Sequence, residues 1–374
     1  MKRIALFVFI IVSASFVFSV FNGPEDESHQ TKFNESYAIY ALNQPEIIGF
    51  AGEKMPLDQN DIQERFDREL LVNTYWQSQT ILFIKKAYKY FPVIEPILKK
   101  EGIPSDFKYL ALAESGLSNI VSPSGATGFW QIMKPTGKEN GLIIHKEVDE
   151  RYHLTKSTKA ACDYLNEAYE KFGSWTLAAA SYNMGKSGLE KQITRQQAGN
   201  YYDLLLNSET ARYLFRICAI KEILEHPKTY GFHVREKDLY SLPPLQKVML
   251  DTSVANFADY AKQLNINYKI LKEYNPWLRQ AHLENKDGWP YWINLPETGY
   301  YTSENKVQKL NSESRSLSVD YDTLKIKVNK NDLLKNIAEA RGIEIEELIL
   351  QNIEVLDIKV KKGQQLQIIK ESMR

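Results

Sequence analysis

Residues 105–133 read SDFKYLALAESGLSNIVSPSGATGFWQIM, and this stretch decides the fold. Its first part predicts a helix that is capped by Ser105, carries apolar residues on one side and ends near Gly116. A loop rich in serine and glycine follows, and then an aromatic–Gln–aliphatic–Met run. We therefore expect a largely apolar helix whose last turn presents Glu114 to a loop that folds back on it.

A carboxylic acid in this place is suited to protonating a glycosidic oxygen. Apolar surroundings that include Phe129 and Trp130 would disfavour the charged form of Glu114 and keep its carboxyl group protonated. Glycines let the backbone approach a ligand closely, and Gln131 and the serines can bond an amide or hydroxyl of a sugar. Taken alone, Glu114 fits an exposed glutamate at a helix end equally well, and that is the commoner case.

The pattern as a whole is more specific than any one motif in it. Glu114-Ser115, followed by a Ser-Pro-x-Gly-Ala-x-Gly-x-x-Gln-Ile-Met run, closely resembles the goose-type-lysozyme-like lytic transglycosylases of glycoside hydrolase family 23. Three more elements agree in order and approximate spacing: the Asp-x-Arg at 149–151, the Ala-Ala-Ser-Tyr-Asn-Met-Gly at 179–185 and the Glu-Thr-Ala-Arg-Tyr at 209–213. The resemblance is to the membrane-bound D type, which carries carboxy-terminal LysM repeats. It implies a mainly α, lysozyme-like catalytic domain over residues 55–230.

The resemblance also implies a reaction and its residues. Glu114 would cleave the β-1,4 bond between N-acetylmuramic acid and N-acetylglucosamine as acid and then base, leaving 1,6-anhydromuramic ends. The 2-acetamido group of the substrate replaces the second carboxylate of most glycosidases. The same resemblance gives the expected substrate-binding residues, which are Ser122, Gln131, Met133, Tyr182, Asn183, Glu209 and Tyr213.

Some of these assignments have alternatives. Met133 is equally suited to core packing, and Asn183 to holding its loop together. Asp149 is expected to pair with Arg151 or to cap the next helix rather than to act as a second carboxylate. Asn119 stands where the family commonly has proline, and the gap from Glu114 to the following Ser-Pro is one residue shorter than in some members. Both departures alter details of the cleft.

Composition limits the other classes of function. The formal net charge is zero, so the chain lacks the basic field of non-specific nucleic-acid binders. The six histidines are scattered and no Cys-x-x-Cys occurs, so we expect neither a metal nor a cofactor. Two buried free thiols are favoured for Cys162 and Cys218, with a disulfide left open.

The amino terminus predicts export. Lys2 and Arg3 precede an apolar run that ends at Phe21, so residues 1–21 are expected to be a signal peptide or membrane anchor. The protein would then lie in the periplasm or the cell envelope. Polar residues 22–54 are expected to be a linker.

Two similar stretches follow the catalytic domain. Each has an amphipathic helix, a break, a second short helix, an asparagine and then a strand-like run, which predicts a repeated β-α-α-β module. A chance likeness of two helices is the alternative. We place a degenerate LysM-like module at 245–298, a linker at 299–320 and a LysM-like module at 321–370.

Two other functions remain open. A muramidase on the same fold would add water and needs a second carboxylate or a held water molecule. A catalytically weak peptidoglycan-binding scaffold would act through the repeats. We expect removal of residues 235–374 to weaken wall binding but to leave some cleavage of soluble glycan; unchanged wall binding would mean that the repeats are structural only.

Overall fold

The computed structural model describes residues 27–29, 31–32, 40–297, 321–327, 332–333, 336, 359–360 and 365–371. The chain divides into two compact units, Met1–Asn305 and Lys306–Arg374. The predicted signal or anchor, residues 1–21, lies outside the described residues. Among the residues that are described, no helix is both long and apolar enough to cross a membrane.

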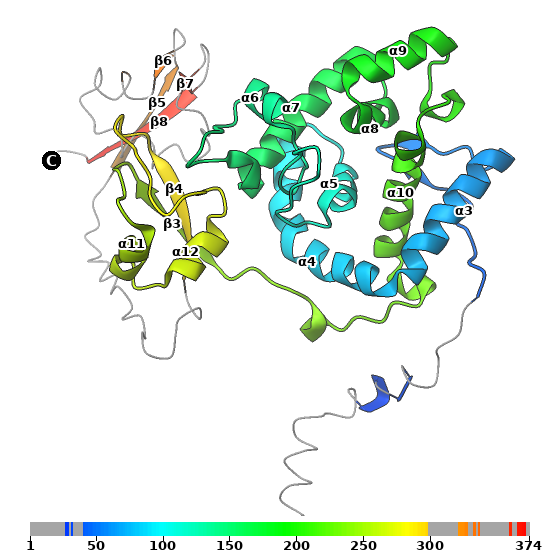
Figure 1. Ribbon diagram of the computed structural model, residues 1–374, viewed down its shortest axis with the longest axis horizontal. Helices are drawn as coiled ribbons and strands as arrows, with labels where there is room; N and C mark the ends of the chain where they lie inside the picture. The colour runs from blue at the N-terminus through cyan, green and yellow to red at the C-terminus, as the bar shows by residue number, and fades with distance from the viewer. Residues whose placement is uncertain are drawn as a thin grey trace, which may run out of the picture. The chain divides into compact units, whose positions relative to one another are not determined.

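The first unit begins with a mainly helical domain. Longer helices surround the short helix α5, which lies at their centre (Figure 1). The helices are α3 Asn60–Tyr75, α4 Gln77–Lys100, α5 Phe107–Ser115, α6 Lys134–Glu139, α7 Leu154–Phe172, α8 Trp175–Met184, α9 Lys186–Gln196 and α10 Ser208–Glu225. Short 3₁₀ turns lie at Glu150–Tyr152, Tyr201–Asp203, Pro227–Tyr230 and Glu236–Asp238.

Helix α5 is buried on nearly every side. Phe107, Leu110, Ala111 and Leu112 are all fully buried, so this helix forms the centre of the hydrophobic core. The predicted apolar helix at this place is confirmed, although Asp106 rather than Ser105 precedes its first residue. The thiols of Cys162 on α7 and Cys218 on α10 lie in the same core, and both are free.

Helix α4 passes through two prolines, a residue type that usually breaks or kinks a helix. Pro92 and Pro96 lie one turn apart on the exposed side of the helix. Each proline removes one backbone donor, and on this side the freed carbonyl oxygens can bond to water instead. Ile94 and Leu98 are fully buried on the opposite side, and their packing favours continuing the helix.

The expected linker at 22–54 is wrong for its last residues. Strands β1 Gly49–Phe50 and β2 Glu53–Lys54 form a short antiparallel hairpin, and Phe50 is fully buried in the helical core. The Glu53 carboxylate accepts hydrogen bonds from the backbone N–H groups of Trp175 and Thr176, so it caps α8.

A β-α-α-β module completes the first unit. It consists of β3 Leu245–Leu250, α11 Phe257–Gln263, α12 Tyr268–Tyr274 and β4 Tyr291–Pro296. The strands pair antiparallel, with Leu245 opposite Pro296 and Leu250 opposite Tyr291. Asn256 and Asn267 cap the two helices, because their side chains accept backbone hydrogen bonds at 2.8 and 2.9 Å. The predicted order of elements is confirmed here.

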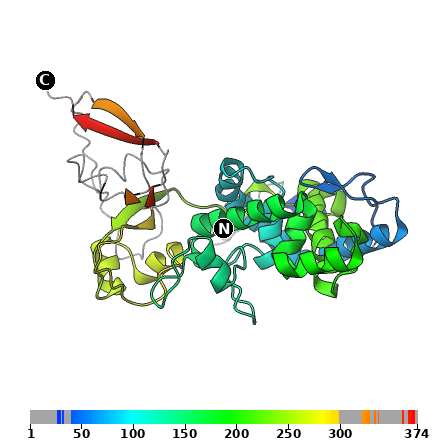
Figure 2. The ribbon, with the colours of Figure 1, turned by 90° about the horizontal axis from the view of Figure 1, so that it is seen from above.

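The second unit is described through its strands and Asn336. β5 Tyr321–Lys327 pairs antiparallel with β8 Gln365–Glu371, and Figure 2 shows the two strands side by side. β6 Asp332–Leu333 pairs with β7 Lys359–Val360. Most residues of the helices expected in this module lie outside the described residues. The predicted fold class, a mainly α domain followed by small α+β modules, is confirmed.

Candidate active site

Glu114 lies in the last turn of α5, and a tyrosine from α10 holds its side chain. The hydroxyl of Tyr213 donates a hydrogen bond to Glu114 Oε1. Tyr213 is almost completely buried, so this contact fixes the carboxyl group at the junction of two core helices. Among the residues that the structure describes, none donates a hydrogen bond to Oε2, which leaves that oxygen available to carry a transferable proton.

Burial raises the pKa of Glu114 to about 7. The Tyr213 hydrogen bond and the positive charge of Arg216 oppose this rise, and the negative charge of Glu209 adds to it. At neutral pH a large fraction of Glu114 is therefore protonated. A carboxyl group with this pKa can donate a proton and later accept one, as general acid–base catalysis requires.

The loop after α5 folds back over the helix end, as expected. Ser115 Oγ donates to the backbone oxygen of Phe129 at 2.7 Å. From α8, the hydroxyl of Tyr182 donates to the backbone oxygen of Trp130 at 2.7 Å. Burial raises the pKa of the Tyr182 hydroxyl, and the negative charge of Glu114 adds to this rise. Two helices thus hold the Phe129–Trp130 turn against Glu114.

Internal hydrogen bonds shape the loop itself. The backbone N–H of Ser122 donates a hydrogen bond to Ala126 O at 2.8 Å. Thr127 and Ile132 form two backbone hydrogen bonds with each other, both at 3.1 Å. Ser122 Oγ accepts from the backbone N–H of Ala126 at 3.0 Å. The Ser122 hydroxyl, expected to bind substrate, is therefore also part of the loop structure.

Gln131 has a structural role in addition to the expected one. Its backbone adopts the left-handed conformation, with φ of 46°. Its side-chain Nε2 donates to the carbonyl oxygens of Gly128 at 2.8 Å and Ile120 at 3.1 Å. A non-glycine residue in this conformation is uncommon and often marks a functional site. Only the side-chain oxygen of Gln131 is left for a ligand.

Met133 lies two residues after Gln131 and is 41% exposed, so the alternative for this residue, core packing, is not what the structure has. The exposed Ile120 and Val121 lie on the same loop. These apolar side chains give the loop a surface that can contact the apolar face of a sugar.

Asn183 and Glu209 connect the end of α8 to the start of α10. Asn183 Nδ2 donates to Glu209 Oε1 at 3.1 Å, and Asn183 Oδ1 accepts from the Thr210 hydroxyl at 2.6 Å. Asn207 caps α10 by accepting from the backbone N–H groups of Glu209 and Thr210. Asn183 therefore holds its loop, the alternative left open for it, and Glu209 remains exposed at the helix start.

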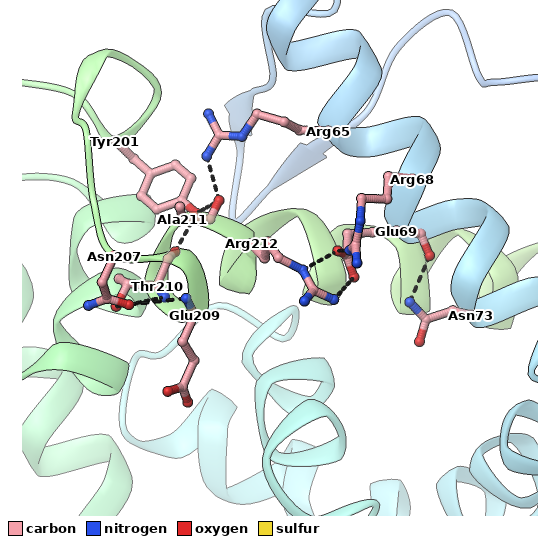
Figure 3. Close-up of polar contacts among 10 residues, drawn as sticks. All are labelled: Arg65, Arg68, Glu69, Asn73, Tyr201, Asn207, Glu209, Thr210, Ala211 and Arg212. Atoms are coloured by element: carbon pink, nitrogen blue, oxygen red, sulfur yellow. Dashed lines mark hydrogen bonds and ion pairs between the residues drawn. The ribbon is translucent and has the colours of Figure 1, made fainter.

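Contacts with α3 also fix the position of α10, and no pattern in the sequence predicted them. The nearly fully buried Glu69 pairs with Arg212 Nε at 2.7 Å and with Arg68, while Arg65 donates to the backbone oxygen of Ala211 (Figure 3). Arg212 directly precedes Tyr213 in the chain. These contacts therefore set the position of the helix that carries the tyrosine bound to Glu114.

Asp149 is committed to Arg151, as predicted. The guanidinium group bonds both carboxylate oxygens, at 2.7 and 3.0 Å, and Asp149 also accepts the backbone N–H of Arg151. Both side chains are buried. The negative charge that raises the pKa of Glu114 comes from Glu209 and not from Asp149. Within the described residues, no group of three His, Cys, Asp or Glu side chains is arranged to hold a metal ion.

The structure thus gathers Glu114, Tyr182 and Tyr213, with Asn183 and Glu209 at the adjoining helix ends. Ser122 and Met133 lie on the loop, and no described contact joins them to Glu114. Sequence reasoning missed Arg216, which acts on both Glu114 and Tyr213 through its charge. Arg216 follows Tyr213 by three residues on the same helix, and this spacing predicts that the two side chains are neighbours.

Comparison with known proteins gives two domain matches. Residues 91–205 match the model of the transglycosylase SLT domain, and residues 246–299 match that of the soluble lytic transglycosylase C-terminal LysM-like domain. The first match contains Glu114 and ends before Glu209 and Tyr213. The second coincides with the β-α-α-β module.

Similar whole proteins are also found. The chain is 26% identical, over 337 residues, to the membrane-bound lytic murein transglycosylase D of Escherichia coli strain K12, covering 86% of this chain and 72% of that protein. The protein of the same name from Escherichia coli O6:H1 strain CFT073 gives the same values. A putative tributyltin chloride resistance protein of Alteromonas sp. strain M-1 is 28% identical over 111 residues, covering 29% of this chain and 53% of that protein.

Proposed function

We propose that this chain, which carries a transglycosylase SLT domain followed by a LysM-like domain, is a lytic transglycosylase of peptidoglycan. The similarity to a lytic murein transglycosylase supports the same activity. One observation carries the proposal for the mechanism: burial raises the pKa of Glu114 to about 7, and Tyr213 fixes its carboxyl group.

In the first step, Glu114 protonates the glycosidic oxygen between N-acetylmuramic acid and N-acetylglucosamine. The bond from C1 to that oxygen breaks, and the oxygen of the 2-acetamido group of the muramic acid bonds to C1. The Tyr213 hydroxyl stabilises the carboxylate that Glu114 becomes, because a hydrogen bond to a charged group is stronger than one to a neutral group.

In the second step, the Glu114 carboxylate takes the proton of the C6 hydroxyl of the same sugar. The C6 oxygen bonds to C1 and displaces the acetamido oxygen, which closes the 1,6-anhydro ring and returns Glu114 to its protonated state. No water is consumed, and one residue acts as acid and then as base.

The ion pairing of Asp149 favours this route over a muramidase with two carboxylates. Asp149 is fully engaged by Arg151, and Glu209 bonds Asn183. We assign Ser122, Gln131, Met133, Tyr182, Asn183, Glu209 and Tyr213 to the substrate cleft, with Gln131 contributing its side-chain oxygen.

For the architecture, we propose residues 55–230 as the catalytic domain, extended by the hairpin at 49–54, and modules at 245–298 and 321–370 that bind glycan. The relative's name contains the words membrane-bound, which supports a place for this chain in the cell envelope.

Mass spectrometry of the muropeptides released from purified peptidoglycan tests the reaction. The parent protein should give products lighter by one water than hydrolysis products, and Glu114→Gln should give none. Reducing-end products would identify a muramidase. If the parent and the variant both bind the wall and release nothing, the chain is a scaffold.

A further inference from the structure

The segment 146–153, here called the docking segment, is the last part of the connection between α6 and α7. Its side chains Val148 and Tyr152 are buried, Val148 completely. They pack in the core of the LysM-like module, with Trp277 and Leu278, and not in the core around α5. The hydrophobic core of the module is therefore completed by residues of the catalytic domain.

Backbone bonds reinforce this contact. Val148 forms an antiparallel bridge with Leu278, the backbone N–H of Asp149 donates to Trp277 O at 2.9 Å, and that of Arg279 donates to Glu147 O at 2.7 Å. Paired backbone bonds fix the direction and the register of two segments, in addition to holding them together.

Side chains add further contacts along the docking segment. The Arg279 guanidinium lies 3.8 Å from the centre of the Tyr152 ring. The Glu147 carboxylate accepts the backbone N–H of Glu284 at 2.7 Å and lies 3.5 Å from His282 Nε2. A flexible tether would not need such a set of directional contacts.

The opposite face of the docking segment holds the cleft loop. Arg151, paired with Asp149, donates to the carbonyl oxygens of Gly125 at 3.0 Å and Ile132 at 3.2 Å. These two residues lie at opposite ends of the loop that carries Gln131. Gly128 of that loop packs so closely that a Cβ atom there would lie 2.1 Å from Arg151 O.

We propose that the LysM-like module at 245–298 positions the cleft loop, by holding the docking segment so that Arg151 clamps residues 125–132. The module then contributes to the geometry of the cleft as well as to any binding of the wall. Arg151 acts as a positioning residue. The activity readout of this proposal rests on the proposed function, and the exchange readout does not.

The test uses the full chain with Val148→Asp, which places a charge in the core of the module and removes nothing from the core around α5. Hydrogen exchange of the loop amides of Ser122, Thr127 and Ile132 should accelerate severalfold, while α5 amides exchange as in the parent. Cleavage of a soluble, uncrosslinked glycan chain should slow by about tenfold or more, because small misplacements of a site are costly.

Lys146→Asp is the matched control. It introduces the same residue two positions away, where the side chain is exposed, and should leave both the exchange and the cleavage rate at parental values. Unchanged loop exchange in Val148→Asp would overturn the proposal. If the parent cleaves no glycan, the proposed function fails, and the exchange result still decides the inference.

Arg279→Ala covers the case in which Val148→Asp unfolds the whole domain and α5 amides also accelerate. Arg279 is exposed, so this variant keeps the core intact. It loses the contact with Tyr152 across to the docking segment, and a hydrogen bond to Pro276 O at 2.7 Å within the module. It should shift loop exchange in the same direction by a smaller factor. Parental exchange in this variant would then refute the proposal.

Discussion

Replacing Tyr213 by phenylalanine tests the central contact of the site. The change removes one hydroxyl group, which donates to Glu114 Oε1 and lowers the pKa of that carboxyl group. A hydrogen bond to a charged group contributes about 1.5–3 kcal/mol, and about 1.4 kcal/mol corresponds to one pH unit. The pKa of Glu114 should therefore rise from about 7 by roughly one to two pH units.

The assay is the pH dependence of kcat/KM on a soluble glycan chain. Activity needs protonated Glu114 in the free enzyme, so it falls as the pH rises through the pKa of this group. In Tyr213→Phe this alkaline limb should move to higher pH by the same one to two units, roughly. The plateau at lower pH should drop by about tenfold, because the carboxylate formed in the first step loses a stabilising donor.

Tyr230→Phe is the matched control. Its hydroxyl donates to Glu222 at 3.0 Å, and both residues are buried in the same domain away from Glu114. It removes the same kind of bond and should leave the alkaline limb in place. If the alkaline limb of the pH profile is unchanged or moves to lower pH in Tyr213→Phe, the argument that this hydrogen bond lowers the pKa of Glu114 is refuted.

Three further predictions concern stability and position. Burial raises the pKa of Glu114 from 4.5 to about 7 in the folded protein, so its contribution to stability is present below pH 4.5 and is lost as the pH rises through 7. Glu114→Gln should therefore melt above the parent at pH 8.5 by an amount equivalent to about 3 kcal/mol, and show little difference at pH 4.5. Gly128→Ala places a methyl group against Arg151 O at φ of 82° and should destabilise by more than about 2 kcal/mol in denaturant titrations, whereas Gly173→Ala, at φ of 68° with open space around it, should lose only about 1 kcal/mol. Glu69→Gln weakens the tie between α3 and α10 and should lower kcat more than KM changes, with a normal rate contradicting its positioning role.

The sequence was informative where local pattern and chemistry coincide. The apolar run before Glu114 predicted the buried helix, because a short helix with few polar residues has to be enclosed by others. The β-α-α-β order of residues 245–296 followed from two amphipathic helices and a strand-like run. Both predictions used periodicity over neighbouring residues.

The sequence was misleading where local rules were outweighed by tertiary packing. Proline usually interrupts a helix, but Pro92 and Pro96 both lie on the solvent-exposed side of α4 while the opposite side is buried. The polar stretch before Met55 indicated a linker, although Phe50 inserts into the core. In each case the deciding term was burial against a distant part of the chain, which composition does not reveal.

Part of the site could not be predicted because its bonds join backbone to side chain. Gln131 was expected to offer its amide group to a sugar, and its nitrogen instead holds two carbonyl oxygens of its own loop. Contacts such as Glu69 with Arg212 join residues far apart in the chain. A single amino-acid sequence contains no information that pairs such positions.

The two buried cysteines can be used to measure how often the core of the catalytic domain opens. Burial raises the pKa of the Cys218 thiol to about 12 and raises that of Cys162 as well, so neither forms the thiolate that reacts with oxidants or disulfides. Both thiols can therefore stay reduced in an oxidising medium for as long as the core around them stays closed. Their rate of alkylation therefore counts openings of α7 and α10, helices on which the cleft depends.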